Sequence, residues 1–351
     1  MAAAQEIQRR VGEAMAVETA IEARDLVRDF GKLRAVDHVS FSVESREIFG
    51  FLGPNGAGKT TTIRMLTTLL EPTSGSVLIG GFDTRRHSYQ ARRRMGLVPE
   101  ESNVYTELSA WDNLLFSARL YRVPGKERDR RATELLELFD LKEKRDVKVQ
   151  SYSKGMRRRL AIAMALIHRP AILFLDEPTS GLDVHSARTI KEIVRGLRAE
   201  GTTVFLTTHQ IEEANQLCDR VAIISRGKIA AIDTPERLKR TAESVQAVEV
   251  AFDRAGPQME GILRHLPGVT DVARLGDKWR LYTPEPPVLL PLLFEFAQQR
   301  ELRLLTLNTL GPSLEDVFLR LTGQRVGEIT DAGNGESPGR GPRGRGGMRN
   351  G

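Results

Sequence analysis

The sequence predicts an α/β protein in which a mostly parallel sheet is interrupted by a helical insertion and followed by a small α+β domain. Three observations predict this fold class. Short apolar segments alternate with helical ones on both sides of a long helical stretch. That stretch has apolar residues at helical spacing, and the chain beyond residue 246 changes to the order β-α-β-β-α-β.

The first elements are strands. "VDHVSFSV" at 36–43 alternates with period two, as a half-buried strand does, whereas "EIFGFLG" at 47–53 is a continuous apolar run typical of a buried strand. A helix is expected directly after this run, and two more strands follow at 75–81 and 95–99.

A helical stretch then extends from Ser109 to about Arg169, where "AWDNLLFSARLY", "RDRRATELLELFD" and "KGMRRRLAIAMALI" each have helical periodicity. Strands return at 171–176, 202–208 and 220–225, with helices between them. Because buried strands joined by helices usually pair in parallel, these segments predict one parallel sheet.

The carboxyl-terminal part begins after a helix and linker at 234–244. Six segments then predict a small domain with the element order of the ferredoxin-like fold, and a last helix follows at 313–323. This domain has no His/Cys cluster, glycine-rich loop or paired acids in an apolar setting, so regulation or oligomer packing is its better interpretation.

These patterns divide the chain into an amino-terminal extension, an α/β domain that contains the helical insertion, a small domain and a Gly/Arg-rich tail that we expect to be disordered. The corresponding ranges are 1–20, 21–240 with the insertion at about 100–169, 246–323 and 324–351.

Composition restricts the class of protein. Hydrophobic residues make up 40% of the 351 and charged residues 28%, as in a soluble globular protein. The single cysteine, Cys218, excludes a disulfide framework, and no apolar run reaches the ~20 residues of a membrane span. The amino terminus lacks the apolar core of a secretory signal, and either Met1 or Met15 is the true start. We therefore expect a cytoplasmic protein.

The net charge of +6 allows nucleic acid, an anionic membrane surface or a polyanionic ligand as a partner. Part of this charge lies in the tail at 337–351, which resembles an RNA-binding arginine–glycine segment. A short terminal stretch of this kind is more often inert, so no nucleic acid is expected.

"GPNGAGKTT" at 53–61 predicts a phosphate site, because glycines let backbone N–H groups surround an anion at a helix start. In this pattern Lys59 reaches the β- and γ-phosphates and the Thr60 hydroxyl binds Mg²⁺. The loop residues that we expect to bind nucleotide are Gly53, Pro54, Asn55, Gly56, Ala57, Gly58, Lys59, Thr60 and Thr61.

"AILFLDEPTSGLD" at 171–183 places two acids at the end of a buried strand, the edge at which open parallel sheets bind ligands. Asp176 is predicted to hold Mg²⁺ opposite Thr60, and Glu177 to act as the base or orienter for attacking water.

Three weaker signals lie at consistent spacing. Ser153 and Gly155 begin a helix just ahead of the acidic strand and offer a second anion site. His209 follows the strand at 202–208 and is placed to touch a γ-phosphate, while Phe30 offers a ring for adenine to stack on. Each signal alone is more often structural.

Together these motifs resemble the nucleotide-binding subunit of an ATP-binding cassette (ABC) transporter, a P-loop NTPase, from Ala23 to about Asp233. Within that family the chain is similar to the drug-resistance and sodium-export branch. The small domain ending in "PSLEDVFLRLTG" resembles the extension typical of that branch.

The resemblance implies an ATP- and Mg²⁺-dependent ATPase with Lys59, Glu177 and His209 as catalytic residues. It adds Glu100 at the Q-loop position, as a nucleotide and metal contact, and Asp183 in the D-loop (180–183). It further implies a homodimer with two bound ATPs, in which Ser153 and Gly155 of one copy complete the other copy's site. A separate membrane permease would dock near residues 100–115 and hold the chain at the cytoplasmic side of the membrane.

Two motifs depart from the family pattern. The signature, usually LSGGQ, is "YSKGM" here, and Glu100 replaces the usual Gln. A carboxylate can approach Mg²⁺ but donates no hydrogen bond, so the water-positioning role of this residue is in doubt. Both variants resemble those common in the branch.

Two rival functions remain open. A soluble ABC ATPase acting on DNA or ribosomes usually carries a long coiled coil, a zinc insertion or two cassettes, none of which this sequence contains. A regulatory binder with an inactive site would not need Glu177 and His209. The transported substrate is not encoded here, and export is implied only by the resemblance.

Overall fold

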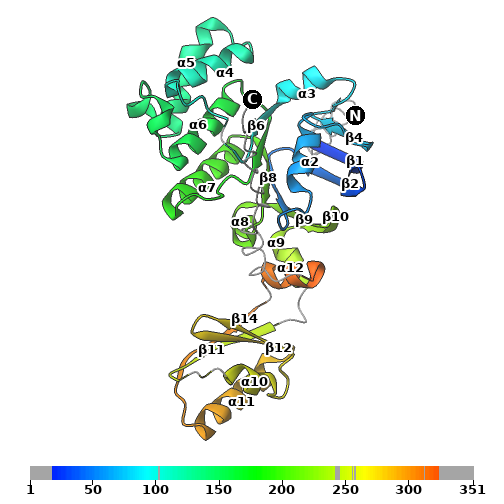
Figure 1. The fold of residues 1–351 in the computed structure, drawn as a ribbon, viewed down its shortest axis with the longest axis vertical. Coiled ribbons are helices and arrows are strands. Elements are labelled where there is room, and N and C mark those ends of the chain that lie inside the picture. The colour runs from blue at the N-terminus through cyan, green and yellow to red at the C-terminus, as the bar shows by residue number, and fades with distance from the viewer. Residues whose placement is uncertain are drawn as a thin grey trace, which may run out of the picture.

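The computed structural model describes residues 18–101, 103–241, 246–254, 256, 258–311 and 313–323. Figure 1 shows a larger α/β body and, below it, a smaller body built from the segment between α9 (Pro235–Arg240) and α12 (Leu314–Thr322). The predicted Gly/Arg-rich tail and all but the last three residues of the predicted amino-terminal extension lie outside the described residues. Strand β1 (Thr19–Phe30) begins two residues before the predicted domain start at 21.

The larger body is organised by a six-stranded sheet with strand order β10-β9-β3-β8-β7-β6. Neighbouring strands from β9 to β6 pair in parallel, and β10 (Lys228–Asp233) is added antiparallel at one edge. The predicted parallel sheet is therefore confirmed. Its parallel strands are β3 (Ile48–Leu52), β6 (Met95–Val98), β7 (Ile172–Asp176), β8 (Thr203–Thr208) and β9 (Arg220–Ser225).

The three central strands carry the functional motifs. Every residue of β3, β7 and β8 is buried, which explains why their sequences are apolar without alternation. Because all three strands run in the same direction, their carboxyl ends meet at one edge of the sheet. The glycine loop, the acid pair and His209 each follow one of these ends.

A second, antiparallel sheet has the order β2-β1-β4-β5 and is built from the amino-terminal part of the larger body. It packs on the central sheet through aromatic rings: Phe41 of β2 stacks on Phe49 of β3 with 5.6 Å between ring centroids. The sequence predicts two of these strands, at 36–43 and 75–81, but neither the other two nor the separation of all four into a second sheet. Their bounds, besides β1, are β2 (Leu33–Glu44), β4 (Ser74–Ile79) and β5 (Phe82–Asp83).

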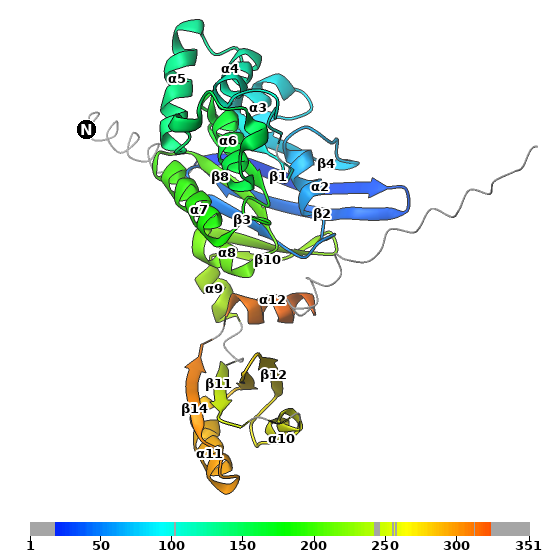
Figure 2. The same cartoon turned by 60° about the vertical axis from the view of Figure 1, so that its left-hand side comes forward.

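The helical insertion is confirmed as α4, α5 and α6, which group at the end of the larger body away from the smaller one (Figures 1 and 2). Helix α4 begins after Ser109, whose hydroxyl accepts a hydrogen bond from the Asp112 amide. The helices of the larger body besides α9 are α2 (Lys59–Leu66), α3 (Ser88–Arg94), α4 (Ala110–Leu120), α5 (Gly125–Leu138), α6 (Lys154–Leu166), α7 (Val184–Ala199) and α8 (Ile211–Leu217), with 3₁₀ turns at Lys142–Lys144 and Val149–Ser151.

The smaller body has the predicted element order, and its four strands form one antiparallel sheet with the order β12-β13-β11-β14. Residues from both of its helices and from its strands form a separate apolar core around Trp279 and Leu293. The bounds are β11 (Gln246–Phe252), α10 (Met259–Arg264), β12 (Asp271–Leu275), β13 (Lys278–Thr283), α11 (Pro286–Gln299) and β14 (Leu304–Leu310).

Helix α12 departs from the predicted domain boundary. The sequence assigns it to the small domain at 246–323, but Leu314, Val317 and Phe318 are buried in the core of the larger body. There they share one apolar cluster with Leu217 of α8 and Leu238 of α9. The apolar face of α12 finds this partner because the chain returns to α9 after β14, so we end the small domain at β14.

No helix in the described ranges is both long enough and apolar enough to cross a membrane.

Candidate functional site

The phosphate loop connects β3 to α2, and Lys59 is the first residue of that helix. The Lys59 ammonium donates hydrogen bonds to the carbonyls of Gly53 (2.8 Å) and Pro54 (3.2 Å), so the loop closes around its own lysine. Gly58 has φ +103°, and a Cβ there would lie 2.6 Å from the Ala35 carbonyl oxygen. Only glycine fits this position.

A cavity of about 300 Å³ opens beside the loop. Phe30 lies at its margin, and the Arg28 guanidinium sits 4.6 Å from the centre of the ring. The other residues that line the cavity come from the loop and from the strand ends: Leu33, Ala35, Asn55, Gly56, Gly58, Lys59, Thr60, Thr61, Glu100 and Glu177. Most of the residues predicted to bind nucleotide therefore border one space.

The remaining loop residues complete its backbone. Ala57 is buried, its amide donates to the Pro54 carbonyl, and its carbonyl accepts from the Gly227 amide. These bonds hold the loop against the end of β9, next to the sheet edge that carries Asp176.

Asp176 is the last residue of β7 and Glu177 follows it, so both acids lie at the same edge of the sheet. Asp176 Oδ1 accepts a 2.5 Å hydrogen bond from the Thr207 hydroxyl of β8, which in turn accepts from the Glu177 amide at 3.0 Å. The Glu177 backbone has φ +48°, a left-handed conformation that residues other than glycine rarely adopt. The neighbouring strand thus holds the Asp176 carboxylate and the Glu177 backbone in place.

Glu177 lies between two basic groups. Its Oε1 is 3.2 Å from the Lys59 ammonium and its Oε2 is 2.8 Å from His209 Nδ1. Burial raises the pKa of the Glu177 carboxyl, but the His209 hydrogen bond and the Lys59 charge outweigh it and hold that pKa below its usual value. The same hydrogen bond raises the pKa of His209 against the opposing effect of burial.

The donor set fits a magnesium ion. Among the described residues, no three His, Cys, Asp or Glu side chains gather closely enough to hold a metal alone. The Asp176 carboxylate is buried at the end of β7, and Thr60 lines the cavity. Magnesium usually takes one or two protein oxygens, with phosphate and water as its other ligands. Such ligands would be Thr60 and Glu100, which line the cavity, and Asp176, which does not line it.

The signature and D-loop residues do not line this cavity. Ser153 accepts a hydrogen bond from the Met156 amide at the start of α6, and Asp183 accepts one from the Ser186 amide at the start of α7. Gly155, in the first turn of α6, packs so closely against α7 that a Cβ on it would collide with the Ser186 hydroxyl. Ser153, Gly155 and Asp183 therefore form a second, separate group.

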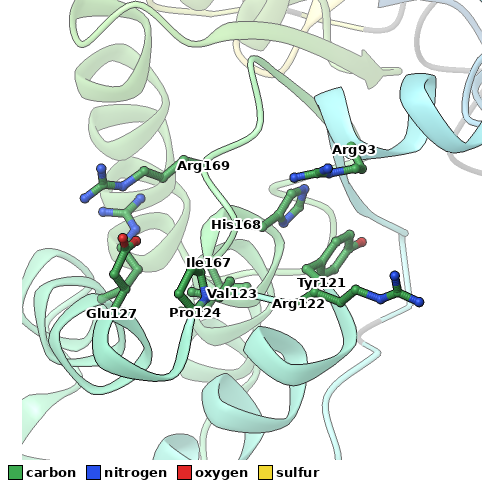
Figure 3. Close-up of a pocket in the computed structure, with 10 residues that line it drawn as sticks. Arg93, Tyr121, Arg122, Val123, Pro124, Glu127, Ile167, His168 and Arg169 are labelled. Atoms are coloured by element: carbon green, nitrogen blue, oxygen red, sulfur yellow. The ribbon is translucent and has the colours of Figure 1, made fainter.

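Figure 3 shows another cavity, of about 140 Å³, between α3, α4 and the end of α6. Two of the lining rings, Tyr121 and His168, stack with 3.7 Å between centroids, and His168 Nε2 lies 3.0 Å from the Met95 carbonyl. Burial lowers the pKa of His168 to about 4, so this imidazole is neutral at pH 7. The cavity contains none of the predicted site residues.

Sequence reasoning missed three buried polar residues near the acid pair: Thr207, Arg158 and Glu213. The Glu213 carboxylate accepts a 2.8 Å hydrogen bond from the Thr179 hydroxyl, and burial raises its pKa. The burial of Arg158 could have been predicted from the sequence, because helical spacing places it on the same face of α6 as Ala161, Ile162 and Ala165.

Residues 36–180 match the protein family described as "ABC transporter". Similarity to individual proteins extends over nearly the whole chain. "Daunorubicin resistance ATP-binding protein DrrA2" of Streptomyces coeruleorubidus is 39% identical over 317 residues, which cover 89% of this chain and 98% of the relative. "Linearmycin resistance ATP-binding protein LnrL" of Bacillus subtilis is 35% identical over 87% of this chain and 99% of its own length. "Nod factor export ATP-binding protein I" of Ralstonia nicotianae is 37% identical over 87% of this chain and 94% of its own length.

Solved structures resemble the larger body. The chain titled "Structure of ATP binding subunit of ABC transporter" aligns with a TM-score of 0.59 at 30% identity, covering 64% of this chain and 93% of that one. The ATP-binding cassette MJ0796, in a dimeric post-hydrolysis state bound to ADP and Pi, aligns with a TM-score of 0.56 at 27% identity. The alignment covers 61% of this chain and 98% of that one.

Proposed function

This chain belongs to the ABC transporter family, as an ATP-binding subunit of the drug-resistance and Nod factor export branch, and on that premise we propose that it hydrolyses ATP to drive export through a separate membrane permease. One observation carries the proposal. A phosphate-loop lysine and a glutamate held by a histidine meet at one cavity, and the buried Asp176 immediately precedes that glutamate at the end of β7. Each is a part that phosphoryl transfer to water requires.

In the proposed reaction the phosphates of ATP lie in the loop and adenine stacks on Phe30. The Lys59 ammonium exchanges its contact with Glu177 for the β/γ-phosphate oxygens, which frees Glu177 Oε1 to orient and deprotonate water. His209 keeps Oε2 in place and carries positive charge toward the γ-phosphate. Thr60 and Asp176, with Glu100 at the cavity wall, would hold a magnesium ion, which when bound would supply positive charge to the phosphates.

Two copies of the chain are proposed to form the complete ATPase. Ser153 and Gly155 lie outside the cavity of their own subunit, at the first turn of α6, where a partner's γ-phosphate can meet backbone N–H groups. The dimeric MJ0796 structure bound to ADP and Pi is similar to this chain and supports the arrangement. Asp183 would lie at the same subunit boundary.

The permease is proposed to dock near residues 100–115, on the helical insertion, and to hold the chain at the cytoplasmic face of the membrane. We assign the small domain to the ferredoxin-like fold on its strand order and antiparallel pairing. Regulation or subunit packing is its proposed role, since its described residues contain no cluster of metal-binding side chains.

The experiment is a pull-down of the tagged full chain from detergent-solubilised membranes of its native cells, combined with an ATPase assay. We expect one multispan membrane protein to co-purify, and the Lys59→Ala variant to retain that partner while losing hydrolysis. Co-purification of ribosomes or DNA would instead support the soluble ABC class. Membrane association without any protein partner would indicate direct lipid binding by the basic surface.

A further inference from the structure

Arg158 is the second of three consecutive arginines in the first half of α6, and it faces inward. Its exposed fraction is 4%, whereas the flanking Arg157 and Arg159 are only partly buried. Helix α6 begins with Ser153 and Gly155, so Arg158 lies about one turn beyond the signature.

The Arg158 guanidinium joins two segments that are far apart in sequence. Its Nη1 donates to the carbonyls of Pro99 and Glu100, the latter at 3.2 Å, in the loop that follows β6. Its Nη2 donates to the Asp176 carbonyl at 2.6 Å and its Nε to the Pro178 carbonyl at 3.1 Å, at the end of β7. All four acceptors are main-chain oxygens of the two segments that carry the proposed magnesium ligands.

Burying the charged Arg158 side chain costs folding free energy, which would be unexpected if the residue only supported the fold. Burial lowers the pKa of Arg158 to about 10, although the charges of Asp176 and Glu100 oppose that effect, so the side chain remains charged at neutral pH. An apolar residue would fill the same space without desolvating a charge. The guanidinium instead provides several donors in one rigid plane, a geometry that a lysine cannot reproduce.

We propose that Arg158 is a positioning residue for hydrolysis, which fixes the backbone of Glu100 and of Asp176 relative to helix α6. The inference rests on the proposed ATPase function and extends it. Movement of α6 when Ser153 and Gly155 engage a partner's ATP is transmitted through this one guanidinium to the metal-binding end of the site.

The test compares Arg158→Lys with Arg159→Lys in the full-length chain. Arg159 is a matched control on the same helix, because it also donates to main-chain carbonyls, those of Phe139 and Asp140 at the end of α5. We expect Arg158→Lys to bind ATP with an affinity within about twofold of wild type but to lose ~10- to 100-fold in kcat, as a small displacement of reacting groups does. Arg159→Lys should retain wild-type kcat.

A double-mutant cycle distinguishes positioning from structural support. If Arg158 acts through Glu100, Arg158→Lys should lower kcat less in a Glu100→Ala background than in the wild-type chain. Arg158→Gln provides a second variant if the lysine variant unfolds. The inference would be overturned if the kcat effects of Arg158→Lys and Glu100→Ala simply multiplied in the double variant. It would also be overturned if Arg158→Lys lowered ATP affinity and kcat to the same extent. A wild-type chain without turnover would contradict the proposed ATPase function itself, and this inference with it.

Discussion

Glu177 Oε2 and His209 Nδ1 lie 2.8 Å apart although 32 positions separate the two residues in sequence. The contact exists because β7 and β8 are neighbours in parallel, so the residues that follow their carboxyl ends come together. Together with Lys59 on the other carboxylate oxygen, it forms the electrostatic centre of the site.

The pKa of His209 should lie above its ordinary value in the wild-type chain and be lower in Glu177→Gln than in the wild type. The carboxylate is the largest cause of the raised pKa, and burial together with the Lys59 charge lowers the pKa once that carboxylate is gone. NMR titration of the imidazole resonances measures both values. The other five histidines serve as internal controls, and an unchanged His209 pKa in the variant would show that the two residues are not in contact in solution.

Lys59→Ala should weaken ATP binding by ~10- to 100-fold, since a charge-assisted contact to phosphate is lost. Hydrolysis should be abolished. Equilibrium binding of a fluorescent ATP analogue measures the affinity, and Arg64→Ala, an exposed cation on the same helix, is the matched control. Wild-type affinity in the Lys59 variant would mean that the loop is only a structural connection.

Ser153→Arg should bind ATP normally and fail to dimerise. The bulky side chain would occupy the place of the partner's γ-phosphate, while Ser153 does not line the cavity of its own subunit. Analytical ultracentrifugation with ATP, in a Glu177→Gln background, follows the dimer. Ser151→Arg, also exposed and two residues earlier, should still dimerise. Dimers of the Ser153 variant would contradict the two-subunit site.

His168→Phe should make the protein less sensitive to acid. The pKa of about 4 in the folded chain is below the usual value near 6.5. Between those pH values the unfolded chain binds a proton that the folded chain does not, so stability falls as pH is lowered through this window. Each unit of pKa difference corresponds to about 1.4 kcal/mol.

Phe keeps the stacking on Tyr121 seen in Figure 3 but cannot be protonated. Urea unfolding at pH 7 and pH 5 measures the effect, and His185→Phe, an exposed position on α7, is the control. An equal loss of stability in wild type and His168→Phe between these pH values would refute the prediction.

Much of the larger body is predictable because its signals are local. The glycine loop, the acids after β7 and the apolar runs of β3 and β8 each identify themselves within a few residues. The pairing of Phe41 with Phe49 across two sheets, and the return of α12 to α8 and α9, depend on contacts between distant segments. No local pattern specifies such contacts.

Arg158 shows the same limit within the site. The sequence predicts α6 and its signature residues, and helical spacing places the middle arginine of "RRR" at 157–159 on the apolar face, but no local pattern names its partners. Only the positions of the β6 and β7 ends in space show that the middle arginine binds both. The Lys59–Glu177 contact is likewise a consequence of β3 and β7 lying on either side of β8.

The most direct test of the account is the Mg²⁺-dependent ATPase rate of Glu177→Gln in the full-length chain, with the exposed acid Glu212→Gln as control. Gln retains the size of the side chain but cannot accept a proton from water. We expect kcat to fall by ~10²- to 10⁴-fold with ATP affinity preserved, as loss of a general base requires, and the control to be unaffected. Wild-type turnover by Glu177→Gln would contradict the assignment of this group as the catalytic centre.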